Sequence, residues 1–442
     1  MRLVDRLRPV PDRATAPTPA GYEEARQRIH ARLLERVDLR ALGADGAGAA
    51  PRLRALLGRL VDEERLPLNR AERARLVSEL QDEILGLGPL EPFLRDESVQ
   101  DILVNGPEQV YVERGGVLER TAARFRDREH LMAVIDRVVA EVGRRVDESS
   151  PMVDARLPDG SRVNVILPPL SLAGPVLSIR RFGREPLGME DLLGNGTLVP
   201  EMARFLEAAV VSRLGILISG GTGTGKTTLL NALSGFIPEG ERIITIEDSA
   251  ELRLRQPHVV PLEARPPNVE GRGEVTLADL VKNSLRMRPD RIVVGEVRGA
   301  EVLDMLQAMN TGHPGSMSTV HANSPRDALW RLEVMAAMAG HGFPERALRA
   351  LLASAIQVVV QLARFPDGSR RVVSISEMAG AGAEPGTLRE LFVFEQSRVE
   401  AGGRVAGRFR GLCRPERFDA HLRVHGFDLP DDLFRVSVAV EG

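Results

Sequence analysis

The spacing of hydrophobic positions changes near residue 200 and divides the chain into two regions. Between residues 53 and 182, a helical pattern over residues 70–85 is followed by short apolar runs that turn-forming residues separate. The predicted strands are residues 101–104, 109–113, 117–121, 152–157, 162–166 and 174–182, with a helix predicted over residues 128–146. Such a mixture indicates an α+β domain.

From residue 201 onward, continuous apolar runs alternate with helical segments. The runs are residues 214–218, 243–246, 292–294 and 316–320. This alternation predicts a parallel sheet with helices between its strands, which is the α/β class. Two amphipathic helices are predicted over residues 325–338 and 344–362, before a hairpin turn at Pro366, Asp367 and Gly368.

The remaining segments are less regular. Residues 1–52 combine a tail, a helical pattern over residues 21–40 and a linker over residues 42–51, while residues 183–200 form a Gly/Pro-rich linker. Residues 381–442 are rich in Arg and Gly and are treated as a C-terminal extension. No apolar stretch reaches the ~20 residues that span a bilayer, so we expect no transmembrane segment and no signal peptide.

Composition narrows the function classes. The chain has 59 basic and 62 acidic residues, and this balance does not favour general binding of nucleic acid or anionic membranes. The single cysteine, Cys413, excludes an intramolecular disulfide and any multi-cysteine metal site. The basic residues include two lysines, Lys226 and Lys282, and the others are arginines. The presence of a lysine at a position in this chain therefore favours a specific role for its side chain, whereas the presence of an arginine does not.

The strongest motif matches G-x-x-x-x-G-K-[ST] between a short apolar run and a helical segment. It consists of Gly220, Gly221, Thr222, Gly223, Thr224, Gly225, Lys226, Thr227 and Thr228. Successive backbone N–H groups and the helix N-terminus would hold the phosphates of ATP. Lys226 would reach the β- and γ-phosphates, and the Thr227 hydroxyl would bind Mg²⁺. The alternative is a Gly-rich turn that binds nothing.

Three further apolar runs end in polar residues, at the edge of a parallel sheet where ligands bind. Glu247 and Asp248 follow the second run, Glu296 the third and His321 the fourth. Glu296 could bind Mg²⁺ through water or polarise the attacking water, Glu247 is its rival as the base, and Asp248 would support the metal. His321 could contact the γ-phosphate. Solvated acids and a neutral histidine bonded at the sheet edge remain the simpler alternatives.

Phosphoryl transfer also requires positive charge against the developing transition state. Candidates in the first region are Arg156 and Arg162 on the predicted hairpin, and Arg180 and Arg181 at the end of the next strand. Surface salt bridges are the alternative role for each of them.

Several long stretches resemble the secretion ATPases of type II and type IV systems, and within them the CpaF-type ATPases of Flp (tight adherence) pilus assembly. ILISGGTGTGKTTLLNAL, ITIEDSAEL, RPDRIVVGEVRGAE and TGHPGSMSTVHANSPRDAL resemble the Walker A, Asp box, Walker B and His box. LGLGPLEPFL, DILVNGPEQVYVERGG and SSPMVDARLPDGSRVN resemble the family's N-terminal domain. The resemblance covers residues 70–380.

The resemblance implies a PAS-like α+β domain, residues 53–182, and a RecA-like P-loop ATPase domain, residues 201–380. It implies a hexameric ring in which ATP and Mg²⁺ sit between the two domains, under arginines of the first. Domain motion would drive pilin extraction or pilus growth through inner-membrane platform proteins, from the cytoplasmic face of the membrane. No direct nucleic-acid partner is expected.

Three other functions stay open. A conjugative or pilus-retraction motor of the same superfamily would differ in its genomic neighbours. A non-hydrolysing scaffold switched by ATP would release no phosphate, and the presence of both Glu247 and Glu296 argues against it. A nucleic-acid translocase would be stimulated by DNA.

Overall fold

The computed structural model describes residues 21–36, 48–64, 66–141, 143–181, 187–268, 271–339, 344–379, 387–400 and 403–440. The described residues belong to two compact units, which divide between Arg184 and Glu185. Each unit has its own hydrophobic cores.

The first unit begins with a layer of helices around a core of leucines and isoleucine. The helices are α1 (Tyr22–Arg36), α3 (Ala49–Glu63) and α4 (Arg70–Leu85). Helix α4 begins at a capping box, in which Asn69 Oδ1 accepts from the Glu72 N–H (2.9 Å) and Glu72 Oε2 accepts from the Asn69 N–H (2.8 Å). The linker predicted over residues 42–51 is wrong at its end, because α3 begins at Ala49 and buries Leu53, Leu57 and Leu60 at helical spacing.

The rest of the first unit is an antiparallel sheet with a helix on it. Within the described residues the strand order is β3-β2-β1-β6-β5-β4. The strands are β1 (Val99–Asn105), β2 (Val110–Arg114), β3 (Val117–Arg120), β4 (Met152–Arg156), β5 (Arg162–Ile166) and β6 (Val176–Arg180). Helix α6 (Arg128–Glu141) packs on this sheet, and shorter η3 (Gly88–Leu90) and α5 (Glu91–Arg95) precede β1. The helix predicted to continue to residue 146 ends earlier, and Gly143 beyond it has a φ of +67°.

In the described part of the second unit, one sheet has the order β16-β15-β14-β13-β12-β7-β11-β10-β8-β9. The strands are β7 (Ile216–Gly220), β8 (Ile243–Glu247), β9 (Val259–Glu263), β10 (Arg291–Val297), β11 (Met317–Val320), β12 (Val358–Arg364), β13 (Arg370–Met378), β14 (Leu388–Val399), β15 (Val405–Gly411) and β16 (Ser437–Val440). Pairing is parallel from β12 through β7 to β9 and antiparallel from β12 to β16.

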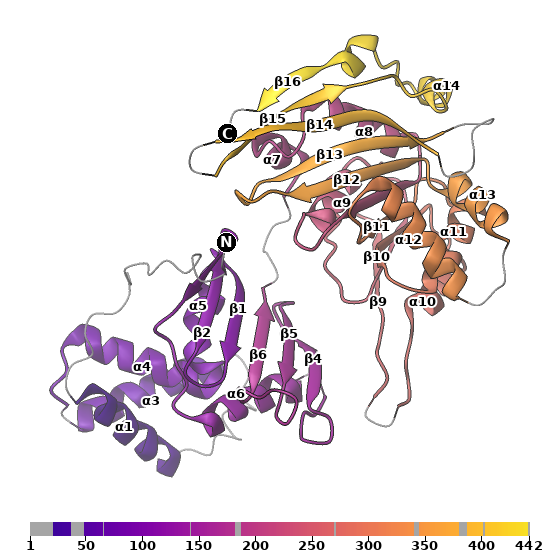
Figure 1. The fold of residues 1–442 in the computed structure, drawn as a ribbon. Coiled ribbons are helices and arrows are strands. Elements are labelled where there is room, and N and C mark those ends of the chain that lie inside the picture. Colours follow the sequence, from indigo (N-terminus) through magenta and orange to yellow (C-terminus); the bar gives the residue numbers. More distant parts are fainter. Residues whose placement is uncertain are drawn as a thin grey trace. The chain divides into compact units, whose positions relative to one another are not determined.

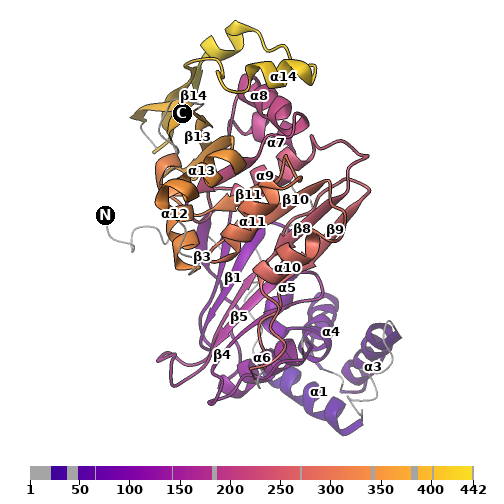
Figure 2. The same ribbon diagram turned by 90° about the vertical axis from the view of Figure 1, so that its right-hand side faces the viewer.

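Helices cover both faces of the parallel half. On one face α7 (Met189–Gly194), α8 (Pro200–Val211) and α9 (Lys226–Ser234) share a core with Ile216 and Ile218 of β7. On the other face Leu217 belongs to a core with α10 (Leu277–Ser284), α11 (Glu301–Asn310), α12 (Pro325–Met338) and α13 (Glu345–Ala355), and Figure 2 looks onto these helices. The α/β class predicted from the sequence is confirmed.

Three segments differ from their predictions. The helix predicted over residues 344–362 is wrong in its second half, because α13 ends at Ala355 and the β-branched run Val358–Arg364 forms β12 at the centre of the sheet. The linker predicted over residues 183–200 contains α7, whose Leu192 is buried in the core.

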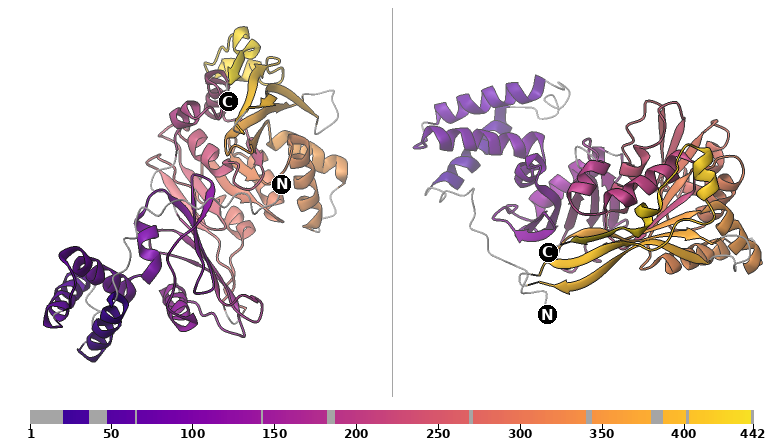
Figure 3. Two further views of the ribbon diagram at one scale, coloured as in Figure 1. Left: turned by 60° about the vertical axis from the view of Figure 1, so that its left-hand side comes forward. Right: turned by 90° about the horizontal axis from the view of Figure 1, so that it is seen from above.

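The residues treated as a C-terminal extension are the third. Strands β14, β15 and β16 continue the same sheet side by side (Figures 1 and 3). Between β15 and β16, α14 (Asp419–Val424) and η4 (Asp431–Arg435) join the core that contains α8, where the Phe434 ring lies 6.1 Å from that of Phe205. Among the described helices, none is both long enough and apolar enough to cross a membrane.

Candidate nucleotide-binding site

The Gly-rich motif forms a tight loop between a buried strand and a helix. Strand β7 ends at Gly220 and α9 begins at Lys226, with Gly225 as its N-cap residue at a φ of +97°. A Cβ built on Gly220 would lie 2.5 Å from Thr224 Oγ1 and 2.9 Å from the carbonyl oxygen of Leu362, so the loop needs glycine there. Its backbone N–H groups and the N-terminus of α9 provide the environment that binds phosphate.

The Lys226 side chain contacts the first residues of this loop. Its Nζ donates to the carbonyl oxygens of Gly220 and Gly221, each at 3.1 Å. Thr224 Oγ1 also donates to the Gly221 carbonyl, at 2.9 Å. A bound phosphate would offer the ammonium charged acceptors, which form stronger hydrogen bonds than these neutral carbonyls.

The carboxylate of Glu247 is a buried anchor for the loop that follows β8. The residue is 4% exposed, and its Oε1 accepts the N–H groups of Glu251 (2.8 Å) and Leu252 (3.0 Å). A Cβ on Gly295 of the neighbouring β10 would lie 2.8 Å from Glu247 Cγ. The space that Gly295 leaves therefore admits the Glu247 side chain.

Glu296, by contrast, lies near the Gly-rich loop, with His321 between them. His321 Nε2 lies 3.4 Å from Thr222 Oγ1, and His321 Nδ1 lies 3.9 Å from Glu296 Oε1. The imidazole therefore lies between the loop and the end of β10. The sequence predicted that both residues follow strands that end at one edge of a parallel sheet, and the structure makes β10 and β11 parallel neighbours.

Arg298 joins the acids of two strands, and sequence reasoning gave it no role. Its Nε and Nη2 donate to Glu296 Oε2 at 2.9 and 2.6 Å, and its Nη1 lies 3.4 Å from Asp248 Oδ2. The available signal was its position two residues after Glu296, which places both side chains at the same strand end. In a chain this rich in arginine, that signal is weak.

The imidazole of His321 is held neutral near pH 7. Partial burial lowers the pKa of His321, and the nearby Lys226 ammonium lowers it further, while the Glu296 carboxylate opposes this shift. A neutral imidazole can accept a hydrogen bond at one nitrogen and donate at the other.

Oxygen ligands for Mg²⁺ are present beside the Gly-rich loop. Thr227 Oγ1 donates to Glu251 Oε2 at 3.3 Å, so a hydroxyl and a carboxylate adjoin at the start of α9. Asp248, to which the sequence assigned the metal, has a 65% exposed side chain and is paired with Arg298. Hydroxyl and carboxylate oxygens suit Mg²⁺, so Thr227 and Glu251 could bind it directly or through water. No group of three or more His, Cys, Asp or Glu side chains among the described residues is arranged to hold a metal ion.

Three of the four candidate arginines of the first unit form a row across its sheet. Arg156 pairs with Arg162 between β4 and β5, and Arg162 pairs with Arg180 between β5 and β6. Directly opposed residues share a face, so this row concentrates positive charge there. Asp101 of β1 continues the row beside Arg180; burial raises the pKa of Asp101, and the Arg180 charge opposes that shift.

Arg181 is not part of the row. Its Nη1 donates to the carbonyl oxygen of Asp96 and to that of Val99, the latter at 3.3 Å. The guanidinium therefore ties the residues before β1 to the end of β6.

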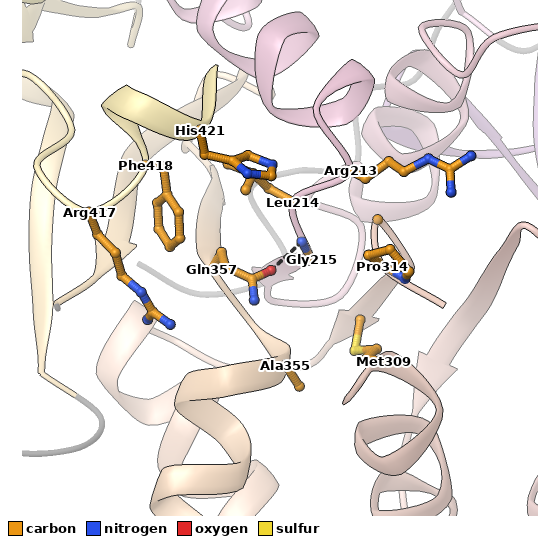
Figure 4. A pocket seen from close by; sticks show the side chains of 11 residues that line it. Arg213, Leu214, Gly215, Met309, Pro314, Ala355, Gln357, Arg417, Phe418 and His421 are labelled. Atoms are coloured by element: carbon orange, nitrogen blue, oxygen red, sulfur yellow. Dashed lines mark hydrogen bonds between the residues drawn. The ribbon is translucent and has the colours of Figure 1, made fainter. Parts of the chain in front are cut away.

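A pocket of about 360 Å³ lies at the opposite end of β7 from the Gly-rich loop (Figure 4). Gln357 Oε1 accepts from the Gly215 N–H, His421 Nε2 bonds the Ser212 carbonyl at 2.7 Å, and Arg417 Nη1 donates to the Ala353 carbonyl at 3.0 Å. These polar groups hold the chain together at this edge, whereas the motif residues lie at the other.

Comparisons with known proteins found a family and several similar proteins. The sequence profile of the family described as "Type II/IV secretion system protein" matches residues 83–391. A Mycobacterium tuberculosis protein whose name refers to conjugal transfer is 43% identical over 308 residues, covering 68% of this chain and 87% of that protein. The type IV secretion system protein PtlH homolog of Bordetella bronchiseptica is 37% identical over 317 residues, covering 65% and 93%.

Among solved structures, the VirB11 ATPase of the Brucella suis type IV secretion system is similar at 31% identity with a TM-score of 0.36. That match covers 66% of this chain and 96% of the other.

Proposed function

This chain belongs to the type II/IV secretion system protein family, and on that premise we propose that it is an Mg²⁺-dependent ATPase that powers assembly of a Flp-type pilus. The order of the strands in the sheet is the observation that supports the proposed ATPase activity. The Gly-rich loop follows β7. His321 directly follows β11, Glu296 is the second-last residue of β10 and Glu247 is the last residue of β8, and these are the next three strands of the sheet. A phosphate-binding loop and acid–base groups therefore share one edge.

The residues at this edge divide the work of hydrolysis. The loop amides and Lys226 bind the phosphates, and Mg²⁺, when bound beside Thr227, supplies charge that stabilises the transition state. We assign polarisation of the attacking water to Glu296, because its carboxylate faces His321 and the loop. Glu247 is the weaker candidate, since it is 4% exposed and its Oε1 anchors the backbone after β8, whereas the Glu296 side chain is 24% exposed.

The motor itself would be a homo-hexameric ring at the cytoplasmic face of the inner membrane. In this proposal the row of Arg156, Arg162 and Arg180 closes over ATP, and the resulting domain motion acts on pilins through inner-membrane platform proteins. The concentration of three arginines on one sheet face supports a role for them against an anion. The resemblance of the N-terminal motifs to CpaF-type ATPases supports the pilus assignment, and nucleic acid is not a direct partner.

A conjugative motor is the second candidate, because relatives over 308 and 318 residues carry names that refer to conjugal transfer. Both motors require hydrolysis and differ in the machine they drive. A non-hydrolysing scaffold switched by ATP would need the loop that binds ATP and would not need the residues that act in hydrolysis.

Complementation of a strain lacking the gene tests the proposal. Wild-type protein should restore surface pili, and Lys226→Ala protein at the same cellular level should not. Lys282→Ala is the matched control, because Lys282 is the other lysine and its side chain is 62% exposed on α10. Loss of plasmid transfer with pili intact would favour the conjugative motor, and full piliation by Lys226→Ala would overturn an ATP-driven role.

A further inference from the structure

A β-hairpin lies against the Gly-rich loop on the flank opposite His321. In the sheet, β7 has β11 on one side and β12 on the other, so the residues at the end of β12 adjoin the loop from the second side. Arg364 is the last residue of β12 and Arg370 is the first of β13, and the two are directly paired.

Both guanidinium groups are close to the loop backbone. Arg370 Nε donates to the Gly223 carbonyl at 2.8 Å, and its Cδ lies 3.6 Å from where a Cβ on Gly225 would be. Arg364 Nη1 lies 3.5 Å from where a Cβ on Gly223 would be. Gly223 and Gly225 have φ values of +71° and +97°, so the arginines approach the two loop glycines that have a left-handed backbone conformation.

The Arg364 guanidinium forms no hydrogen bond or ion pair with any of the residues that the structure describes. Among the described residues its guanidinium therefore has no carboxylate partner, and its Nη1 lies beside Gly223 of the loop. With Lys226, three cationic side chains border the loop.

The hairpin is anchored by its own turn and by contacts with β14 and β15. Asp367 Oδ2 accepts from the Val405 N–H at 2.7 Å, and Asp367 Oδ1 accepts from the Ser369 N–H at 2.9 Å. The buried Arg371 donates to the Val405 carbonyl at 2.9 Å and lies 4.7 Å from the ring centroid of Phe394. Strands β14 and β15 thus hold Arg364 and Arg370 over the loop.

We propose that Arg364 and Arg370 bind the part of the nucleotide that ATP and ADP share, its α- and β-phosphates, and thereby set the affinity for both. This inference rests on the proposed function. The phosphate that is cleaved must lie on the flank that carries Glu296 and His321, and the rest of the polyphosphate then extends toward β12. Guanidinium groups match phosphate oxygens in geometry and keep their charge.

Titration of the full-length protein with fluorescent mant-ADP and mant-ATP tests this directly. Arg364→Gln and Arg370→Gln should each raise the Kd of both nucleotides about tenfold, the loss of one charged hydrogen bond. Their kcat at saturating ATP should stay within about twofold, because the groups that act on water are untouched. Arg398→Gln on β14 is the control, since Arg398 is 71% exposed and paired with Glu400, and it should leave both Kd values unchanged.

Thermal unfolding of each variant separates lost binding from lost folding, and Arg364→Lys should recover part of the affinity through its charge. The inference is overturned if the wild type binds nucleotide and the double variant binds it equally well. It is also overturned if kcat falls while Kd does not change. A wild type that binds neither nucleotide would instead overturn the proposed function itself.

Discussion

The two flanks of the Gly-rich loop carry opposite chemistry. On the β11 side, the ends of parallel strands present His321, Glu296 and Glu247, whose side chains are able to accept or donate protons. On the β12 side, an antiparallel hairpin presents Arg364 and Arg370, which can only donate and attract negative charge. The difference teaches that one loop can have separate sides for the reaction and for holding the nucleotide.

The flanks also differ in how they are built. The acidic side chains are themselves part of the strand ends, and Glu247 is buried among them. The arginines are exposed at the loop and depend on contacts made behind them by β14 and β15. Changes on the first flank should therefore alter rate or folding, and changes on the second should alter affinity.

The largest expected effect is on the rate. Glu296→Gln should lower kcat for ATP hydrolysis by about 10²–10⁴-fold, because the neutral amide is a much weaker base toward the attacking water than the carboxylate. The Kd for ATP should change little, since the arginine flank is intact. Phosphate release and mant-ATP titration measure the two quantities, with Glu239→Gln in an exposed turn as the control. Unchanged kcat would remove Glu296 from the reaction and return Glu247 to that role.

A smaller effect is expected on stability. Gly295→Ala would place a Cβ 2.8 Å from Glu247 Cγ, and the resulting overpacking should lower the free energy of unfolding by about 1–3 kcal/mol. Gly240→Ala is the matched control, because a Cβ there meets no atom within 4 Å. Urea unfolding compares the two variants. Equal stability of both would mean that Glu247 is not confined as the structure has it.

The smallest effect concerns pH. Because burial lowers the pKa of His321, this imidazole is less protonated in the folded protein at pH 6.5, where an unfolded histidine is half protonated. Its contribution to stability is therefore complete above about pH 6.5 and is lost as the pH falls below that value. An NMR titration of His321 should give a midpoint under 6.5. A midpoint at or above 6.5 would contradict the environment described for the imidazole.

The loop and its acidic flank were predictable because each depends on local sequence. Apolar runs that end in Glu247, Glu296 or His321 mark strand ends, and parallel strands bring their ends to one edge. The contacts of Arg298 with Glu296 and Asp248 could not be predicted, because they depend on which side chains meet at the ends of β8 and β10. Arg370 donates to Gly223, which lies 147 residues earlier in the sequence. Only the pairing of β12 with β7 brings Arg370 and Arg364 to the loop.

The prediction of one helix over residues 344–362 was wrong for a related reason, because local sequence alone does not show which strand a segment pairs with. The run that forms β12 is apolar, and an apolar run of this length fits a buried helix or a buried strand. Its β-branched residues favour a strand, but the helical pattern before it suggested continuation. With β12 mistaken for a helix, the hairpin that carries the two arginines could not be placed beside the loop.

The central claim is that the Gly-rich loop binds ATP for hydrolysis, and steady-state phosphate release by purified protein tests it most directly. We predict Mg²⁺-dependent release by the wild type and by Lys282→Ala, with a loss of at least about 10²-fold in Lys226→Ala. Release by Lys226→Ala at the wild-type rate, or none from the wild type under conditions where it binds ATP, would contradict the account.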